Sequence, residues 1–175
     1  MEYKLFTNEL KNSAKMLKAG DRVLLSGTVY TSRDAAHKRI FEMMDKAERL
    51  PYDIAGAVVY YAGPTPTPDG LPIGSCGPTT SGRMDVYAPK MLDMGLVAMI
   101  GKGGRKQSVV DAIVRNGAVY FCAIGGCGAL AAKCIKSCEV IAFDDLGCES
   151  VKRLTIENFP LIVGIAPDGS SLFKD

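Results

Sequence analysis

The stretch LVAMIGKGGRKQSVVDAIVRNGAVYFCAIGG, residues 96–126, predicts two buried strands joined by a helix. An apolar run at 96–100 leads into a glycine turn, apolar residues then recur at helical spacing over 106–115, and a second apolar run covers 118–124. Strands and helices alternate in this way between residues 54 and 143. We therefore expect an α/β fold with helices layered on a mixed, partly parallel sheet.

The patterns on either side of this stretch predict further elements of both kinds. Thr31 or Ser32 is expected to cap the helix that follows it, and Thr79 or Thr80 the next one, because a hydroxyl there accepts from a free backbone N–H. The predicted helices cover residues 10–17, 31–49, 81–94 and 130–138, and the predicted strands cover 23–25, 54–61, 140–143, 153–157 and 161–165.

The segment AGPTPTPDGLPIGSCGPTTSGRMD, residues 62–85, fits neither kind of element. Between Gly63 and Gly82 it contains five prolines and five glycines, which exclude a long helix or a central strand. Asp69 is the only charged residue between Ile54 and Gly82. Long irregular loops in compact domains usually carry a function, so we expect this one to contribute to a site.

Composition restricts the class of protein. The chain has 175 residues, 47% of them hydrophobic and 23% charged, with a formal net charge of +2. This excludes a disordered chain and predicts one compact domain over residues 1–175. The small net charge favours neither nucleic acid nor anionic lipid as a partner. The N-terminal MEYKLFTNELK lacks the apolar core of a signal peptide, and no apolar run is long enough for a membrane helix. We expect a cytoplasmic protein.

The six cysteines lack the spacing of a metal or redox motif, because no C-x-x-C pair occurs. We interpret them as small buried apolar residues in a reducing compartment, and expect no metal ligands in this chain. The alternative is an iron–sulfur or redox site built from several of them. They are Cys76, Cys122, Cys127, Cys134, Cys138 and Cys148.

Arg33 stands in the first turn of a predicted helix, beside backbone N–H groups that favour an anion. His37, the single histidine, follows four residues later and therefore shares its face of the helix. The alternative is an ordinary amphipathic helix with Arg33 as a surface charge. The role of His37 stays open between a catalytic and a structural one.

Two further positive side chains stand at similar places. Arg83 returns to a helix end one turn after Thr79 and Thr80, so that hydroxyls, N–H groups and a guanidinium converge there. Lys102 lies in the glycine turn after an apolar strand, where α/β sheets bind ligands. Together with Arg33, these residues suit a small dianion better than a nucleotide, because no aromatic stacking partner or ribose-binding acid is evident.

Four motifs, in this order, resemble a known family. They are SGTVYTSRDAAHKR, YYAGPTP, GPTTSGRMD and MIGKGG, at residues 26–39, 60–66, 77–85 and 99–104. The chain resembles the β chain of class I, iron–sulfur-dependent fumarases, which is also the C-terminal domain of the single-chain enzymes, and it is similar to the β subunit of L-tartrate dehydratase. The similarity extends over nearly the whole chain, as far as NFPLIVGIAPDG at 158–169.

The resemblance implies a swivelling β/β/α domain and a hydro-lyase that interconverts fumarate and L-malate. It also implies an α2β2 complex in which a separate α subunit binds a [4Fe–4S] cluster, so that this chain is inactive alone. Thr79 matches the family's proton-abstracting threonine, and His37 matches the histidine of its RDAAH motif. The substrate-binding residues implied by the resemblance are Arg33, Thr79, Thr80, Arg83 and Lys102.

The sequence leaves the substrate and two alternatives open. The GRMD ending of the third motif and the short tail favour fumarate over tartrate, but the choice among fumarate, malate, tartrate and methylated relatives depends on the shape of the pocket. Cys127, Cys134 and Cys138 stand where the family usually has small residues, and we interpret them as packing residues. A dicarboxylate-binding or assembly module without catalysis is the main alternative to a hydro-lyase subunit.

Overall fold

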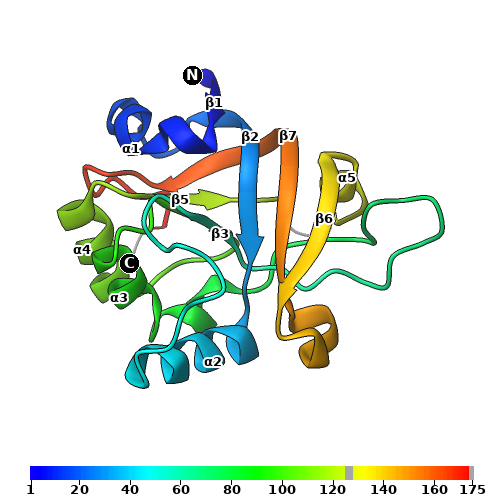
Figure 1. The fold of residues 1–175 in the computed structure, drawn as a ribbon. Helices are drawn as coiled ribbons and strands as arrows, with labels where there is room; N and C mark the ends of the chain where they lie inside the picture. Colours follow the sequence, from blue (N-terminus) through cyan, green and yellow to red (C-terminus); the bar gives the residue numbers. More distant parts are fainter. Residues whose placement is uncertain (125–127, 174–175) are drawn as a thin grey trace.

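The computed structural model describes residues 1–124 and 128–173, which contain a seven-stranded mixed sheet (Figure 1). The strand order is β1-β2-β3-β4-β5-β7-β6. The strands from β1 to β5 are all parallel to one another, whereas β7 is antiparallel to β2, β5 and β6. The predicted mixed, partly parallel sheet is therefore confirmed. The strands are β1 (Glu2–Phe6), β2 (Arg22–Thr31), β3 (Val58–Tyr60), β4 (Ala98–Gly101), β5 (Val119–Cys122), β6 (Ile135–Ala142) and β7 (Val151–Ile165).

The sheet closes on itself, because β2 pairs with β7 as well as with β1 and β3. Strand pairing thus runs from β2 through β3, β4, β5 and β7 and back to β2. Successive side chains point to opposite faces of a strand, and they divide here between two cores. Tyr60 and Phe121 belong to a core shared with β1, β2 and β7, while Val59, Met99 and Tyr120 belong to a core shared with helices.

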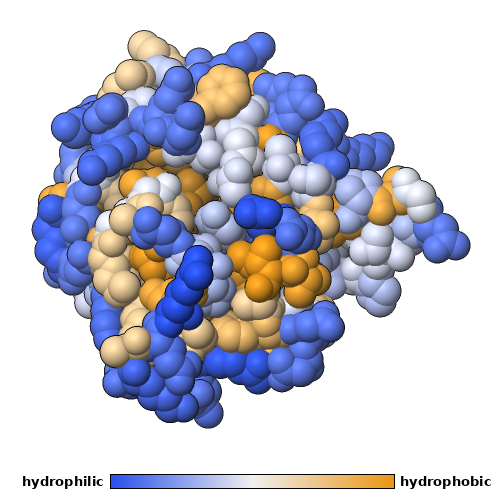
Figure 2. Space-filling model, viewed as in Figure 1, coloured by the Kyte–Doolittle hydropathy of each residue, from blue (hydrophilic) through white to orange (hydrophobic). Residues whose placement is uncertain are grey.

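The helices are short and lie outside the ring of strands (Figure 1). Buried residues of α2, α3 and α4 complete the second core. The segment after β3 projects from the body on the side of α5 and β6 (Figure 1), and Figure 2 shows it covered largely by residues of intermediate hydropathy. Of the described residues, none form a helix long and apolar enough to span a membrane. The helices are α1 (Leu10–Ser13), α2 (Asp34–Asp45), α3 (Ala88–Asp93), α4 (Gln107–Asn116) and α5 (Gly128–Lys133), and the 3-10 turns are η1 (Thr7–Glu9), η2 (Ala14–Met16), η3 (Ser81–Met84) and η4 (Asp144–Glu149).

The strongest sequence patterns gave the right elements. The strand at 96–100, the helix at 106–115 and the strand at 118–124 correspond to β4, α4 and β5 within a few residues. The helix predicted over 130–138 is right for 130–133 and wrong beyond them, because α5 ends at Lys133 and the chain continues as β6. Hydrogen bonding of β6 to β7 decides this segment, and local helical spacing does not.

Three other predictions differ from the structure in their boundaries. The helix over 81–94 begins only at Ala88, after the turn η3, and Pro89 occupies its first turn, where a missing N–H is tolerated. The strands at 153–157 and 161–165 are one strand, β7, with an irregular register opposite residues 25–27 of β2. The helices over 10–17 and 31–49 shorten to α1 and α2. The edge strand β1 was not predicted at all.

Candidate functional site

All four motifs meet at one edge of the sheet. β2, β3 and β4 are parallel neighbours, so their carboxyl ends share this edge. Arg33 lies just beyond β2 and Lys102 directly follows β4, while Thr79 donates its backbone N–H to Tyr61 O beside β3 at 2.7 Å. Gly63 packs against the arginine, since a Cβ there would lie 3.1 Å from Arg33 Nη1. Open α/β sheets bind ligands at this kind of edge.

The threonine motif and the lysine turn are joined by backbone contacts. Thr80 and Lys102 form a parallel β-bridge, and the N–H of Ser81 donates to Lys102 O at 3.0 Å. The N–H of Lys102 donates in turn to Ser81 Oγ at 3.0 Å. Gly101 makes this approach possible, because a Cβ at that position would lie 1.9 Å from Ser81 Oγ. The predicted Thr79, Thr80 and Lys102 are thus neighbours.

The two predicted arginines flank a single carboxylate. Arg83 Nε lies 3.0 Å from Asp34 Oδ1, and Arg33 Nη2 lies 4.0 Å from Asp34 Oδ2. On its other side, Arg33 Nε lies 3.8 Å from Glu149 Oε1. Arg83 is 56% exposed and Arg33 22%, so both remain open to an anion from solvent. Sequence reasoning missed Asp34 and Glu149 as partners; the position of Asp34 beside Arg33 was the one signal, and Glu149 gave none.

Several polar atoms around Arg33 are buried without a hydrogen-bond partner among the residues that the structure describes. They are Arg33 Nε, Asp34 Oδ2 and Glu149 Oε1. Buried polar atoms are rarely left unpaired, because each loses its hydration without compensation. These atoms face one another, since Arg33 Nε lies 3.8 Å from Glu149 Oε1 and Arg33 Nη2 lies 4.0 Å from Asp34 Oδ2. The two carboxylates therefore hold the guanidinium by charge at distances longer than a hydrogen bond.

His37 lies beneath this surface, with 1% of its area exposed. Its Nδ1 lies 2.8 Å from Ser32 Oγ and 2.9 Å from Arg33 O, and a proton on Nδ1 suits the carbonyl contact. Burial lowers the pKa of His37 to about 4, despite the bond to the Arg33 carbonyl, so the ring is neutral at pH 7. The residue is thus placed to hold the backbone of Arg33.

The predicted side-chain caps are not observed. The residues at the N-cap positions of α2 and η3 are Arg33 and Thr80, and neither forms a side-chain capping hydrogen bond within the described part of the chain. Thr31 Oγ1 instead donates to Ser150 O and accepts from the N–H of Lys152, and the Ser32 hydroxyl contacts His37. Both hydroxyls are used to fix the segment between β2 and α2 to its surroundings, so the capping prediction is wrong for these positions.

The cysteines differ in exposure. Cys76 is fully buried, and burial raises the pKa of its thiol to about 12. Cys122, Cys134 and Cys138 are half-buried, whereas Cys148 is exposed, which makes the buried interpretation wrong for this one. Cys127 lies outside the described residues. Within 1–124 and 128–173, no group of three or more His, Cys, Asp or Glu side chains could hold a metal ion.

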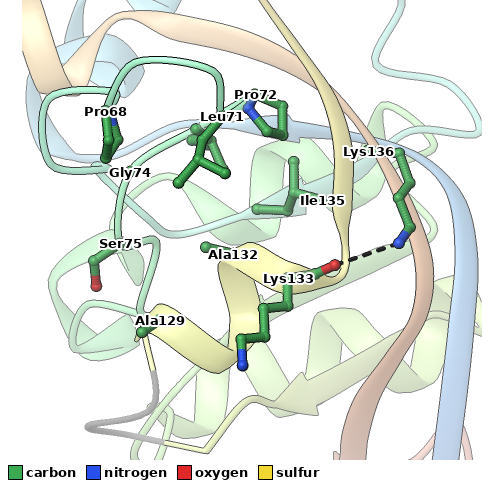
Figure 3. A pocket seen from close by; sticks show the side chains of 11 residues that line it. Pro68, Leu71, Pro72, Gly74, Ser75, Ala129, Ala132, Lys133, Ile135 and Lys136 are labelled. Atoms are coloured by element: carbon green, nitrogen blue, oxygen red, sulfur yellow. Dashed lines mark hydrogen bonds between the residues drawn. The ribbon is translucent and has the colours of Figure 1, made fainter.

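The residues Arg33, Arg83 and Lys102 form what we call the cationic edge. A separate groove of about 660 Å³ lies between the projecting loop and α5–β6 (Figure 3). Its lining is mainly apolar and includes Leu71 and Ile135, with Lys133 and Lys136 among its polar residues. Lys136 Nζ donates to Lys133 O at 3.4 Å (Figure 3). None of the predicted site residues lines this groove.

The chain belongs to the fumarase C-terminus family, which it matches over residues 2–175. It is 39% identical over 181 aligned residues to a Methanocaldococcus jannaschii protein named "Putative L(+)-tartrate dehydratase subunit beta", covering 100% of this chain and 92% of that one. It is also 40% identical to the aerobic class I fumarate hydratase of Escherichia coli over 87% of this chain and 28% of that enzyme. Identity to fumarate hydratase 2 of Leishmania major is 38%, over 95% and 30% of the two chains. The chain thus spans less than a third of the fumarate hydratases it matches.

Proposed function

We propose that this chain is the β subunit of a two-subunit hydro-lyase that interconverts fumarate and L-malate. The observation that carries the proposal is the convergence of Arg33, Arg83 and Lys102 with Thr79 and Thr80 at the shared edge of three parallel strands. A dicarboxylate presents two planar anions, and two guanidiniums and an ammonium give it complementary donors.

The proposed chemistry assigns the proton transfer to Thr79. In the dehydration direction its Oγ1 takes a proton from the carbon next to a carboxylate, the C–H electron pair becomes the double bond, and hydroxide leaves the neighbouring carbon. A threonine is a weak base unless nearby cations stabilise its alkoxide, and Lys102 and Arg83 are placed in the same motif cluster. They also stabilise the charge that develops on the substrate carboxylate.

The second subunit is part of the proposal. We assign a [4Fe–4S] cluster to an α subunit in an α2β2 complex, as the resemblance to class I fumarases implies, and the name of the M. jannaschii relative, a β subunit, supports a second subunit. Such a cluster supplies a Lewis acid for the departing hydroxide. The open, solvent-facing position of Arg83 and Lys102 leaves room for a covering subunit.

The test is anaerobic coexpression of the tagged chain with its α subunit, followed by fumarate hydration assays of the chain alone and of the complex. We expect turnover only by the complex. Thr79→Ala should lower kcat by about 100-fold or more, the usual effect of losing a general base, and Thr67→Ala on the projecting loop is the matched control. A fully active Thr79→Ala complex would remove Thr79 as the base. Dicarboxylate binding without turnover would favour a binding module.

L-Tartrate is the second candidate substrate, since the chain matches 92% of the M. jannaschii protein that is named a putative L(+)-tartrate dehydratase β subunit. The two substrates differ by a hydroxyl, which a pocket built to bind it can recognise strongly. The ratio of kcat/KM for malate and tartrate, measured on the same complex, decides between them.

A further inference from the structure

We propose that a buried ion pair between Asp85 and Arg105 positions the threonine motif, residues 77–85, and the lysine turn, residues 101–104, for the reaction. This inference rests on the proposed function. Arg105 Nε donates to Asp85 Oδ1 at 2.6 Å, and the two side chains are 0% and 1% exposed. Asp85 directly follows the turn that carries Arg83, and Arg105 stands three residues after Lys102. The pair therefore links the two segments in the interior of the protein, beneath the surface proposed to bind substrate.

The carboxylate of Asp85 makes a second contact with the lysine turn. Its Oδ2 accepts the backbone N–H of Lys106 at 2.8 Å, so both oxygens are used within the 105–106 segment. A carboxylate held by a guanidinium and an N–H has little freedom to rotate. This fixes the distance between η3 and the glycine turn.

Arg105 also contacts two tyrosines of the sheet region, Tyr61 just after β3 and Tyr120 in β5. Its guanidinium lies 5.3 Å from the ring centroid of Tyr61 and 4.9 Å from that of Tyr120, and its Nη2 lies 3.4 Å from the Tyr61 hydroxyl. Cations over aromatic faces are favoured more strongly when they are shielded from water. The carbonyl of Tyr61 is the acceptor for the Thr79 N–H, so Arg105 contacts the residue that places the proposed base.

A hydrogen-bond chain runs parallel to the ion pair. Lys102 N–H donates to Ser81 Oγ at 3.0 Å, Ser81 Oγ lies 2.9 Å from the Tyr120 hydroxyl, and that hydroxyl donates to Gly103 O at 2.8 Å. Each of the two hydroxyls can accept one hydrogen bond and donate one, so the chain can be satisfied from the Lys102 N–H to the Gly103 carbonyl. The backbone on both sides of Lys102 is thus tied to β5 through Tyr120.

Stability alone does not account for this arrangement. A buried ion pair loses much of its Coulomb energy to desolvation, and apolar residues of similar volume often do as well. Arg115 and Asp93 form an exposed pair of the same chemistry, with contacts of 2.8 and 2.7 Å, that joins α4 to α3 and touches none of the four motifs. Proton transfer tolerates little misplacement of the reacting groups, and this requirement explains a rigid support under Thr79 and Lys102.

The experiment compares Arg105→Lys with the control Arg115→Lys in the complex with the α subunit. Lysine keeps the positive charge and loses the fork. We expect Arg105→Lys to lower kcat for malate dehydration by about 10–100-fold with a smaller change in KM, and to raise the primary isotope effect with malate deuterated at the carbon that loses the proton.

Amide hydrogen exchange at 79–85 and 102–104 should speed up by about tenfold, and Arg115→Lys should change none of these. Tyr120→Phe, which removes one hydroxyl, should shift the same readouts less and serves if Arg105→Lys does not fold.

The outcomes separate the two proposals. Unchanged kcat and exchange in both variants would overturn the positioning role. A loss of kcat without faster exchange at 79–85 and 102–104 would also overturn it, because the pair would then act by another route. A wild-type complex that converts neither malate nor tartrate would overturn the proposed function. The exchange data would then still decide whether Arg105 braces the two segments.

Discussion

Arg83 and Asp34 join two motifs that lie about fifty residues apart in sequence, through a contact of 3.0 Å between Nε and Oδ1. The same carboxylate faces Arg33 on its other side at 4.0 Å. In the free chain, a residue of the protein therefore stands between the two guanidiniums proposed to bind substrate. The charge of Asp34 opposes a dianion, while its oxygens orient the arginines.

Replacing Asp34 by asparagine removes the charge and keeps the shape. We expect the complex with Asp34→Asn to bind succinate, a non-reacting dicarboxylate, about fivefold more tightly, because one opposing charge near the anion corresponds to about 1 kcal/mol at a partly exposed site. The gain should shrink as salt rises from 20 to 200 mM, since screening weakens the charge. Calorimetric titration measures it.

Asp93→Asn is the matched control for Asp34→Asn, because it breaks an exposed arginine pair away from the motifs. It should leave the dissociation constant unchanged. Weaker succinate binding by Asp34→Asn would mean that orientation of the arginines outweighs the repulsion.

The stability of the complex should depend on pH through His37. Its pKa is about 4 in the folded state against 6.5 in the unfolded chain, so the unfolded chain binds more protons between these values. The free energy of unfolding therefore falls as pH decreases through this window, by about 2.5 kcal/mol between pH 7.5 and 4.5 for this group alone. Urea unfolding at several pH values measures the slope.

His37→Gln isolates the contribution of the histidine, because glutamine keeps a polar side chain but does not titrate. The variant should lose most of the slope between pH 6.5 and 4.5. Hydrogen bonds to Arg115 and Lys18 lower the pKa values of Asp93 and Asp168, respectively. Protonation of these two carboxylates therefore changes the free energy of unfolding mainly below pH 4. An unchanged slope in His37→Gln would contradict the assignment.

The close approach at Gly101 should make an added methyl group costly. In Gly101→Ala the new Cβ would lie 1.9 Å from Ser81 Oγ and 2.9 Å from Tyr61 Cδ2. We expect a loss of about 1–3 kcal/mol in the free energy of unfolding, typical of overpacking, together with lower turnover. The double variant Ser81→Ala/Gly101→Ala removes the closest atom and should recover part of the stability. No recovery would place the strain elsewhere.

Thiol reactivity should distinguish two cysteines. Cys148 is exposed, whereas Cys76 is buried and burial raises the pKa of its thiol to about 12. Because the thiolate is the reactive form, Cys76 should stay unmodified by an aromatic disulfide reagent until the chain unfolds. Cys148→Ser should remove one fast-reacting equivalent from the native protein, and Cys76→Ser should remove none.

The sequence predicted the elements that depend on local pattern. The apolar runs of β4 and β5 and the helical spacing of α4 are strong enough to stand alone, and the glycine turn between them placed Lys102. The first half of β6, up to residue 138, was mistaken for a helix, and only its end was predicted as a strand at 140–143, because its strand conformation depends on β7, which follows it in the chain. Pairing with a later segment leaves little trace in local spacing.

The candidate site divides in a similar way. Arg33, Thr79 and Lys102 were recognisable because each stands in a motif where the local pattern changes: at the start of a predicted helix, in the irregular Pro/Gly segment and in the glycine turn after an apolar run. Their supports were not recognisable, since Asp85 and Arg105 meet across twenty residues of sequence and no local pattern pairs them. A contact between two loops becomes visible only when the strands that carry them are placed side by side.

The closed pairing of β2 with β7 governs the order in which this chain can acquire its structure on the ribosome. More than a hundred residues separate the two strands, and until β7 emerges β2 and β5 each lack the neighbour that completes the ring. Contacts of such long sequence separation slow folding, because a large loop must close before they form. The cationic edge can assemble early from β2, β3 and β4. Until the final strand is synthesised, however, it belongs to a sheet whose unpaired strand edges can pair with other chains.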